Sequence, residues 1–283
     1  MTRPLRIEFE GAFYHIISRG NEKSNIYRDK NDRKNFIDIL RALVKRFQWK
    51  IHTYCLMDNH YHLLLETPLP NLSAGMRQLN GIYTQRFNRK WNRVGHLYQG
   101  RFKSYIIDKD SYLLELCRYI VLNPLQDGKV KNIEDWEWSS YHTLGGFNSS
   151  RDVVFTDTIW SYFSNKVNKA QKQFRDFIYA GIGKDDNIHS KARGGFILGG
   201  EDFTKTLVQM LKTKKLDEIK NEVRYPDRPE MDKIFNNKSR NEGIGIAINQ
   251  WGYGLQEVGG YVNLHYSTIS RIAKKNQNAK NKT

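Results

Sequence analysis

The sequence has few of the features that mark secreted or membrane proteins. It contains 2 cysteines and 6 prolines in 283 residues. Cys55 and Cys117 form neither a C-x-x-C pair nor a disulfide framework, so we expect two buried, reduced thiols. No apolar run approaches the roughly 18 residues that a membrane-spanning helix needs, and residues 1–10 lack the apolar core of a secretory signal. These absences predict a cytoplasmic protein without a membrane partner.

Acidic residues are also scarce relative to basic ones. The chain has 46 Lys and Arg against 30 Asp and Glu, a formal net charge of +16, and such a surface attracts polyanions. With 39% hydrophobic and 13% aromatic residues, it has too much apolar material to be an intrinsically disordered chain. The length suits two compact units or one large domain with an appendage. We therefore expect a globular, nucleoid-associated protein that binds nucleic acid.

The first half of the chain alternates strand and helix patterns. Alternating β-branched or aromatic residues predict strands over 12–18, 50–56, 60–66 and 101–107. Apolar residues at spacings of three and four predict helices over 32–47, 72–91 and 111–122, the last stopped by Pro124. This order predicts the α+β class, with a ferredoxin-like antiparallel sheet, two helices on one face and an open second face.

Two pairs of polar residues could carry chemistry on that sheet. His60 and His62 stand two apart in a strand, so both imidazoles point to one face and can reach one ion. An H-x-H arises by chance in roughly one such chain in four, so the pair alone does not establish a metal site.

Tyr119 and Asn123 share one face of a helix. Taken alone, they are better explained as a packing aromatic and a helix cap.

A basic strip between residues 83 and 103 contains no acidic residue. Its aromatic residues recur every four positions along one helix face, and the cations occupy another face. A solvated basic face would explain this pattern, but in a chain of charge +16 phosphate binding is the more economical explanation. The DNA-binding side chains expected here are Arg86, Arg89, Lys90, Arg93, Arg101 and Lys103.

The second half has a different organisation. Helices are expected over 157–163, 167–178 and 203–211, and the glycine-rich stretch 181–200 reads as a flexible connection. Residues 255–272 have the apolar spacing of a helix-turn-helix, with an earlier helix over 239–250. Its groove-facing residues would be Tyr266, Ser267, Thr268, Ser270 and Arg271. A small helical bundle for protein contacts is the alternative. The expected domains are 1–148, a helical connecting region 149–224, and an all-α domain 225–283 with a basic tail.

Ordered motifs in the first half resemble the REP-associated tyrosine transposases, a branch of the HUH single-strand DNA nucleases. They are Gly11–His15, Met57–His62, Gly95–Phe102, Arg118–Ile120 with Asn123–Pro124, and Trp136–Tyr141. The middle residue of H-U-H is usually a plain hydrophobe, and here it is Tyr61. Strand alternation directs Tyr61 away from the face of the two histidines, which favours Tyr119 as the reacting residue.

This resemblance implies an HUH nuclease fold and an activity. His60, His62 and Asn123 would hold a divalent ion, Mg²⁺ or Mn²⁺, with about three positions of an octahedral ion left open. Tyr119 would attack single-stranded DNA at sites marked by hairpins, which gives a 5′-phosphotyrosine and a free 3′-hydroxyl. The transposase-like protein would act as a monomer or homodimer, and the helix-turn-helix would add duplex DNA as a partner.

Two other functions fit the same residues. The protein could be a non-catalytic regulator that reads nucleic acid through the helix-turn-helix, with a structural H-x-H pair. It could also be a metal-dependent RNA hydrolase in which water attacks and Tyr119 stacks on a base. A covalent protein–DNA intermediate separates the three. Because the expected nucleophile and all three expected metal ligands precede Pro124, we further expect that a chain ending near Ser150 still cleaves single strands, though more weakly and with a shallower salt dependence.

Overall fold

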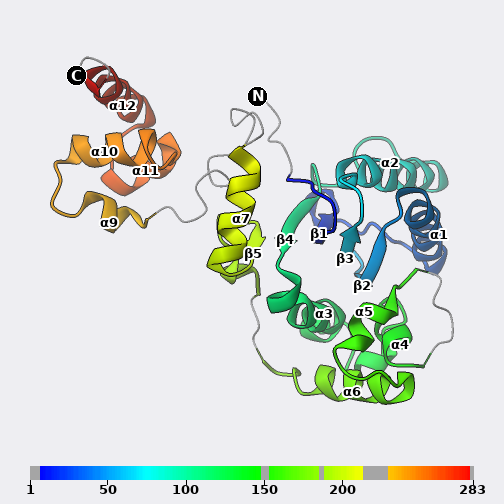
Figure 1. Ribbon diagram of the computed structural model, residues 1–283. Helices are drawn as coiled ribbons and strands as arrows, with labels where there is room; N and C mark the ends of the chain where they lie inside the picture. Colours follow the sequence, from blue (N-terminus) through cyan, green and yellow to red (C-terminus); the bar gives the residue numbers. More distant parts are fainter. Residues whose placement is uncertain (1–6, 148–152, 185–187, 213–228, 281–283) are drawn as a thin grey trace. The chain divides into compact units, whose positions relative to one another are not determined.

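The computed structural model describes residues 7–147, 153–184, 188–212 and 229–280. Residues 7–192 together with 198–200 form one compact unit, called the catalytic unit below because it contains the expected nucleophile and metal ligands, and the other described residues form a second (Figure 1). No helix in these described ranges is long and apolar enough to cross a membrane.

The catalytic unit is built on an antiparallel sheet. Its strands are β1 (Ala12–Arg19), β2 (Lys50–Leu56), β3 (His60–Thr67) and β4 (Lys103–Ile107). The central strand β1 pairs with β3 on one side and β4 on the other, and β2 pairs with β3. The two-residue strand β5 (Ile197–Leu198) completes the order β2-β3-β1-β4-β5. The expected strands and the expected antiparallel sheet are confirmed, with ends shifted by one or two residues.

Two long helices cover one face of this sheet. They are α1 (Lys30–Phe47) and α2 (Leu72–Lys90), and a short 3-10 helix, η1 (Asn21–Lys23), precedes α1. A capping box between Asp29 and Asp32 begins α1, because both side chains bond backbone N–H groups that lack helical partners. The Tyr61 hydroxyl donates to the Asn80 amide oxygen on α2 at 2.6 Å. Tyr61 therefore points to the helical face, away from the histidines, as strand alternation predicts.

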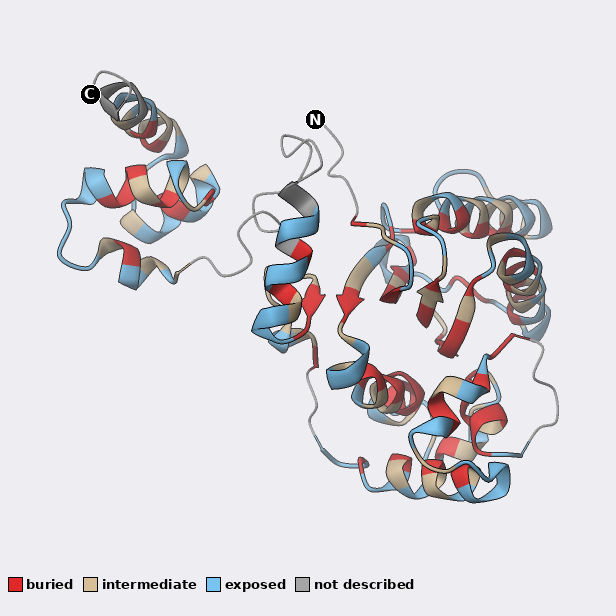
Figure 2. Cartoon of the chain, in the orientation of Figure 1, coloured by how far each residue is buried: buried red, intermediate tan, exposed pale blue. Residues whose placement is uncertain are grey.

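The second face is not open, contrary to expectation, because α3 (Lys109–Gln126) lies on it. Leu116, Cys117 and Ile120 of α3 belong to the same buried cluster as Phe13 and Leu64 of the sheet. Both cysteines are buried and free, as predicted. Figure 2 shows buried residues along the strands and along α3. This helix brings the expected nucleophile to the sheet.

Pro124 does not stop α3, which also differs from the expectation. A proline removes one backbone donor and so one helical hydrogen bond. The carbonyls of Asn123 and Pro124 nevertheless accept from the N–H groups of Asp127 and Lys129, at 2.9 and 2.8 Å. Because the last turn keeps these partners, the helix continues to Gln126 and Asn123 lies inside it rather than at its end.

Residues 153–192 are part of the catalytic unit rather than a connection beyond it. They form α5 (Thr156–Ser161), α6 (Val167–Tyr179) and η3 (Ile188–Lys191), after η2 (Ile133–Asp135) and α4 (Tyr141–Leu144). Phe174, Ile178 and Ile188 are buried in the cluster that contains α3. The boundaries expected at 148 and 224 lie outside the described residues.

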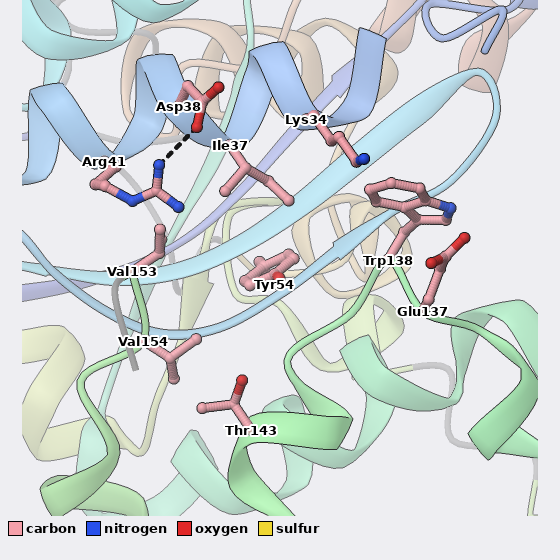
Figure 3. A pocket seen from close by; sticks show the side chains of 10 residues that line it. All are labelled: Lys34, Ile37, Asp38, Arg41, Tyr54, Glu137, Trp138, Thr143, Val153 and Val154. Carbon is pink, nitrogen blue, oxygen red and sulfur yellow. Dashed lines mark hydrogen bonds and ion pairs between the residues drawn. The ribbon is translucent and has the colours of Figure 1, made fainter. Parts of the chain in front are cut away.

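The edge strand β2 is covered by the same region. Val154 bridges Ile51, and Ser139 bridges Cys55. Figure 3 shows Val153 and Val154 lining a pocket with Ile37 of α1. The glycine-rich stretch 181–200 contains η3 and β5, so the expectation of a plain flexible connection is wrong for its described residues.

The second unit contains α7 (Glu201–Lys212) and four C-terminal helices, α9 (Met231–Phe235), α10 (Arg240–Asn249), α11 (Leu255–Val262) and α12 (Tyr266–Lys280). The last four share a core of their own, which includes Ile244, Val258 and Ile269. A short turn joins α11 to α12. A Cβ at Gly259 would lie 2.6 Å from the Leu264 carbonyl oxygen of that turn. The close approach therefore requires glycine, and the connectivity is that of two helices around a tight turn.

Candidate active site

The sheet face under α3 gathers polar side chains from three strands. In the register of β1 and β3, Ile17 lies opposite His62 and Arg19 opposite His60. Residues two apart share a face, so His15, Arg19, His60 and His62 point the same way. The adjacent strand β4 adds Tyr105, opposite His15, and Lys103, opposite Ile17. His60 and His62 are 5% and 3% exposed, and their ring centroids lie 4.9 Å apart.

Hydrogen bonds orient both imidazoles of the H-x-H pair. His60 Nδ1 lies 2.7 Å from the Asn59 Oδ1 atom, and His62 Nδ1 lies 2.9 Å from Nε2 of His15. Metal-bound histidines are commonly held in this way by a partner on the second ring nitrogen. The nitrogen left over in each ring is Nε2. In His62 that atom is buried and has no hydrogen-bond partner among the described residues.

The α3 helix presents Tyr119 to these histidines, and Asn123 follows one helical turn later. The ring of Tyr119 meets His62 edge-on, with centroids 5.9 Å apart, and His15 in the same way at 6.1 Å. The Asn123 amide nitrogen donates to the Tyr119 carbonyl oxygen at 2.8 Å. Because a carbonyl only accepts, the amide nitrogen must face it, and the amide oxygen remains for another partner. The tyrosine and the histidines that face each other belong to one chain.

Burial sets the charge state of the site. Burial, with a smaller contribution from the nearby Arg19, lowers the pKa of His60 to about 4. Burial also holds the pKa values of His62 and His15 well below the usual range. All three imidazoles are therefore neutral at pH 7, the form that binds metals. Burial raises the pKa of Tyr119, and the Asn123 side chain partly opposes this shift.

The side chains around His62 form a donor set that fits a divalent ion. In the part of the chain that the structure describes, no group of three or more His, Cys, Asp or Glu side chains could hold a metal. The set here is different, because its third member is the amide oxygen of Asn123. Two imidazole nitrogens and one oxygen suit Mn²⁺, and Mg²⁺ less strongly. The orphaned Nε2 of His62 is the observation that favours a ligand at this place.

The expected basic side chains divide into two groups. The Lys90 ammonium makes ion pairs with Asp29 and Asp32, each at 2.7 Å, and Arg86 donates to Asn35 at 2.7 Å. These two cations join α2 to α1. The strip's other exposed cations are Arg89, Arg101 and Lys103, and Arg93 is half-buried. In the C-terminal helices Tyr266 and Arg271 are exposed, while Ser267, Thr268 and Ser270 are half-buried.

Two histidines at the site were not among the residues expected there. His15 lies in an apolar strand, and the only signal for it in the sequence is its place at the end of the Gly11–His15 motif. His189 of η3 stacks on His15 and meets Tyr119 edge-on at 5.2 Å. It follows Tyr119 by 70 positions in a glycine-rich stretch, and no local pattern indicates that it reaches the site.

Most residues of the candidate site lie in a range that matches a known protein family. Residues 9–123 match the family model of IS200-like transposases. The resemblance found in the sequence is therefore confirmed, and the matched range includes the two histidines of the pair, Tyr119 and Asn123. The chain is also 26% identical over 141 residues to a protein of Haemophilus influenzae named as a REP-associated tyrosine transposase. That similarity covers 46% of this chain and 78% of the relative.

Two solved structures are similar at 18% identity. One is a REP-associated tyrosine transposase bound to a REP hairpin, with a TM-score of 0.45, and the similarity covers 59% of this chain and 93% of that one. The other is a transposase of Deinococcus radiodurans, with a TM-score of 0.31 and coverage of 42% and 95%. The family match and the curated relative carry the assignment. Residues 9–123 are therefore similar to the tyrosine transposases, which are DNA-processing enzymes.

Proposed function

We propose that the protein is a metal-dependent nuclease and strand transferase of single-stranded DNA, with Tyr119 as its nucleophile. One observation carries the proposal. The Tyr119 ring lies edge-on to His62, whose buried Nε2 has no hydrogen-bond partner among the described residues. A nucleophile and a free metal-binding nitrogen are thereby brought together within one chain, and Asn123 adds an oxygen donor one helical turn away.

The reaction is a transesterification. The Tyr119 hydroxyl oxygen forms a bond to the phosphorus, and the bond from phosphorus to the 3′-oxygen breaks. The phenol loses one proton and the released 3′-oxygen gains one, so the step is balanced. The product is a 5′-phosphotyrosine with a free 3′-hydroxyl. Because the phosphodiester is kept in the covalent linkage, a 3′-hydroxyl can reverse the step without ATP.

His60, His62 and Asn123 are the residues that would hold Mg²⁺ or Mn²⁺. When bound, the ion would supply positive charge at the phosphate oxygens and favour ionisation of a nearby hydroxyl. The chain's own residues prepare this site. Asn59 and His15 fix the two imidazoles, and the Tyr119 carbonyl turns the Asn123 amide so that its oxygen is available.

The DNA substrate would be a single strand marked by a hairpin, in keeping with the name of the Haemophilus relative. Exposed cations of the basic strip, Arg89, Arg101 and Lys103, are suited to phosphate contacts. The α11–turn–α12 pair, with Tyr266 and Arg271 exposed, would bind duplex DNA.

The test is incubation of the protein with pooled single-stranded oligonucleotides from the flanks of its own gene, with Mn²⁺ or with EDTA. We expect a protein–DNA adduct that survives denaturation, in Mn²⁺ only. Tyr119→Phe removes the nucleophilic oxygen and should abolish the adduct while DNA affinity stays within a few-fold. The matched control is Tyr112→Phe, which removes a hydroxyl from the same helix and should leave the adduct intact.

Each rival function gives a different result in that assay. An adduct formed by Tyr119→Phe would refute the assignment of the nucleophile. DNA binding without any cleavage would favour the non-catalytic regulator. RNA cleavage without an adduct would favour hydrolysis by water.

A further inference from the structure

A third histidine ring closes the tyrosine side of the site. His189 stacks on His15, with centroids 5.0 Å apart and ring planes 14° from parallel. It also packs on Tyr105 at 4.5 Å and meets Tyr119 edge-on at 5.2 Å and 90°. Tyr119 is thus bordered by rings from β3, β1 and η3. The family match ends at residue 123, so His189 lies outside it.

The position of His189 is fixed by its neighbours in η3. Ile188 is 1% exposed and belongs to the buried cluster that contains α3. Lys191 makes an ion pair with Glu115 of α3 at 3.7 Å, and the Ala192 N–H donates to the His189 carbonyl at 3.1 Å. These contacts tie η3 to the helix that carries Tyr119. The imidazole is therefore held at the nucleophile by packing on both sides.

Ring packing alone does not explain a histidine here. Both ring nitrogens of His189 are shielded from solvent and lack a hydrogen-bond partner in the described chain. A buried polar atom without a partner is destabilising, and native proteins rarely leave one without a reason. A phenylalanine would make the same ring contacts without this cost. The unpartnered nitrogens beside Tyr119 therefore indicate a ligand that binds during the reaction.

The charge next to His189 indicates the chemical class of that ligand. Lys103 of β4 is exposed and close enough to help lower the pKa of His189, after the larger effect of burial. A neutral imidazole offers one N–H donor, and the neighbouring cation favours an anionic partner. In DNA the anionic acceptors are phosphate oxygens, which side-chain donors commonly bind.

We propose that His189 is a catalytic residue that donates a hydrogen bond to the phosphate attacked by Tyr119. It would hold a non-bridging oxygen of that phosphate. A donor fixed in a site shielded from water stabilises the charge that develops on such an oxygen. This role rests on the proposed function, since it requires Tyr119 to be the nucleophile.

The first test compares two substitutions in the full chain, with Mn²⁺ and a hairpin oligonucleotide that the wild-type protein cleaves. His189→Phe keeps the ring contacts and removes both nitrogens, whereas His189→Gln keeps a donor without a ring. We expect His189→Phe to slow adduct formation about 100- to 1,000-fold in single turnover, and His189→Gln to retain more activity. The matched control is His142→Phe, which changes a histidine packed between aromatic rings on α4 and should react like wild type.

The second test does not depend on cleavage. The Tyr119→Phe protein, labelled with ¹⁵N in its histidine rings, is mixed with the same oligonucleotide. The His189 ring resonance, identified by its loss in the His189→Phe, Tyr119→Phe double variant, should shift on binding, and the His142 resonance should not.

The results that would overturn the role of His189 differ from those that would refute Tyr119 as the nucleophile. Wild-type adduct rates in His189→Phe, or an unshifted His189 resonance with bound DNA, would overturn the role of His189 while Tyr119 keeps its own. If His189→Gln is slower than His189→Phe, the ring rather than the nitrogen matters, which also overturns the proposal. An adduct in Tyr119→Phe would instead refute the proposed function.

Discussion

The buried histidines should make the stability of the catalytic unit sensitive to acid. For His60 the size of this effect can be calculated. Its pKa falls from 6.5 to about 4 because the ring is buried and Arg19 is near. In the unfolded chain, the His60 imidazole therefore takes up a proton as the pH falls through 6.5. In the folded protein, it takes up this proton only as the pH falls through about 4. The contribution of His60 to stability is complete above pH 6.5 and is lost as the pH falls toward 4.

Between pH 7.5 and 5.0, the two pKa values predict a loss of about 2 kcal/mol in the free energy of unfolding from His60 alone. The variant His60→Gln keeps a polar side chain but cannot take up this proton. Its unfolding free energy should therefore fall by about 2 kcal/mol less than that of the wild type over the same pH interval. The buried His15 and His62 shift in the same direction and remain in both proteins.

The assay is urea unfolding in EDTA, followed by tryptophan fluorescence. All tryptophans except Trp251 lie in the catalytic unit, so the signal reports on that unit. The control is His96→Gln, which removes an exposed imidazole and should keep the wild-type pH dependence. If wild type and His60→Gln lose the same stability between the two pH values, within about 0.5 kcal/mol, the argument from burial is wrong.

Four further predictions concern the organisation of the chain. A mixture of Tyr119→Phe and His62→Ala proteins should form no adduct, because the facing tyrosine and histidine belong to one chain; restored cleavage on mixing would mean that partners exchange residues. A chain ending near residue 150 should lose its cooperative melting transition by circular dichroism, because it lacks the buried Phe174 and Ile188. A chain ending near residue 212 should fold and cleave with a weaker salt dependence, and inactivity of that folded form would show that the C-terminal helices contribute to the site. Gly259→Ala should destabilise the C-terminal helices by about 1–3 kcal/mol through the clash with the Leu264 carbonyl, and an unchanged melting curve would contradict this.

Much of the sheet could be predicted from local pattern because strand alternation is a geometric rule. It assigned the two histidines of the pair to one face and Tyr61 to the other, and the pairing register and the Tyr61–Asn80 hydrogen bond agree. Helical spacing likewise placed Tyr119 and Asn123 on one side of α3. These relations connect residues two to four positions apart, where the backbone alone fixes the direction of a side chain.

The end of α3 could not be predicted in the same way. Pro124 costs the helix only the bond to the Ile120 carbonyl, four residues earlier. Whether the helix then ends depends on the next turn, and here the Asn123 and Pro124 carbonyls keep donors in Asp127 and Lys129. The bond from His15 to His62 is also invisible to local pattern, because it joins neighbouring strands that are 47 positions apart in the chain.

The burial of the end of α3 explains why the unit must extend past residue 150. Its buried residues include the unbroken run from Ile120 to Pro124, which goes more than once around the helix axis. A helical segment that is buried all round has to be covered on every side. The sheet covers one side, so the outer side needs a second layer, which α6 and η3 provide through Phe174, Ile178 and Ile188. The same layer brings His189 to Tyr119, so the segment that completes the core of the catalytic unit also borders its nucleophile.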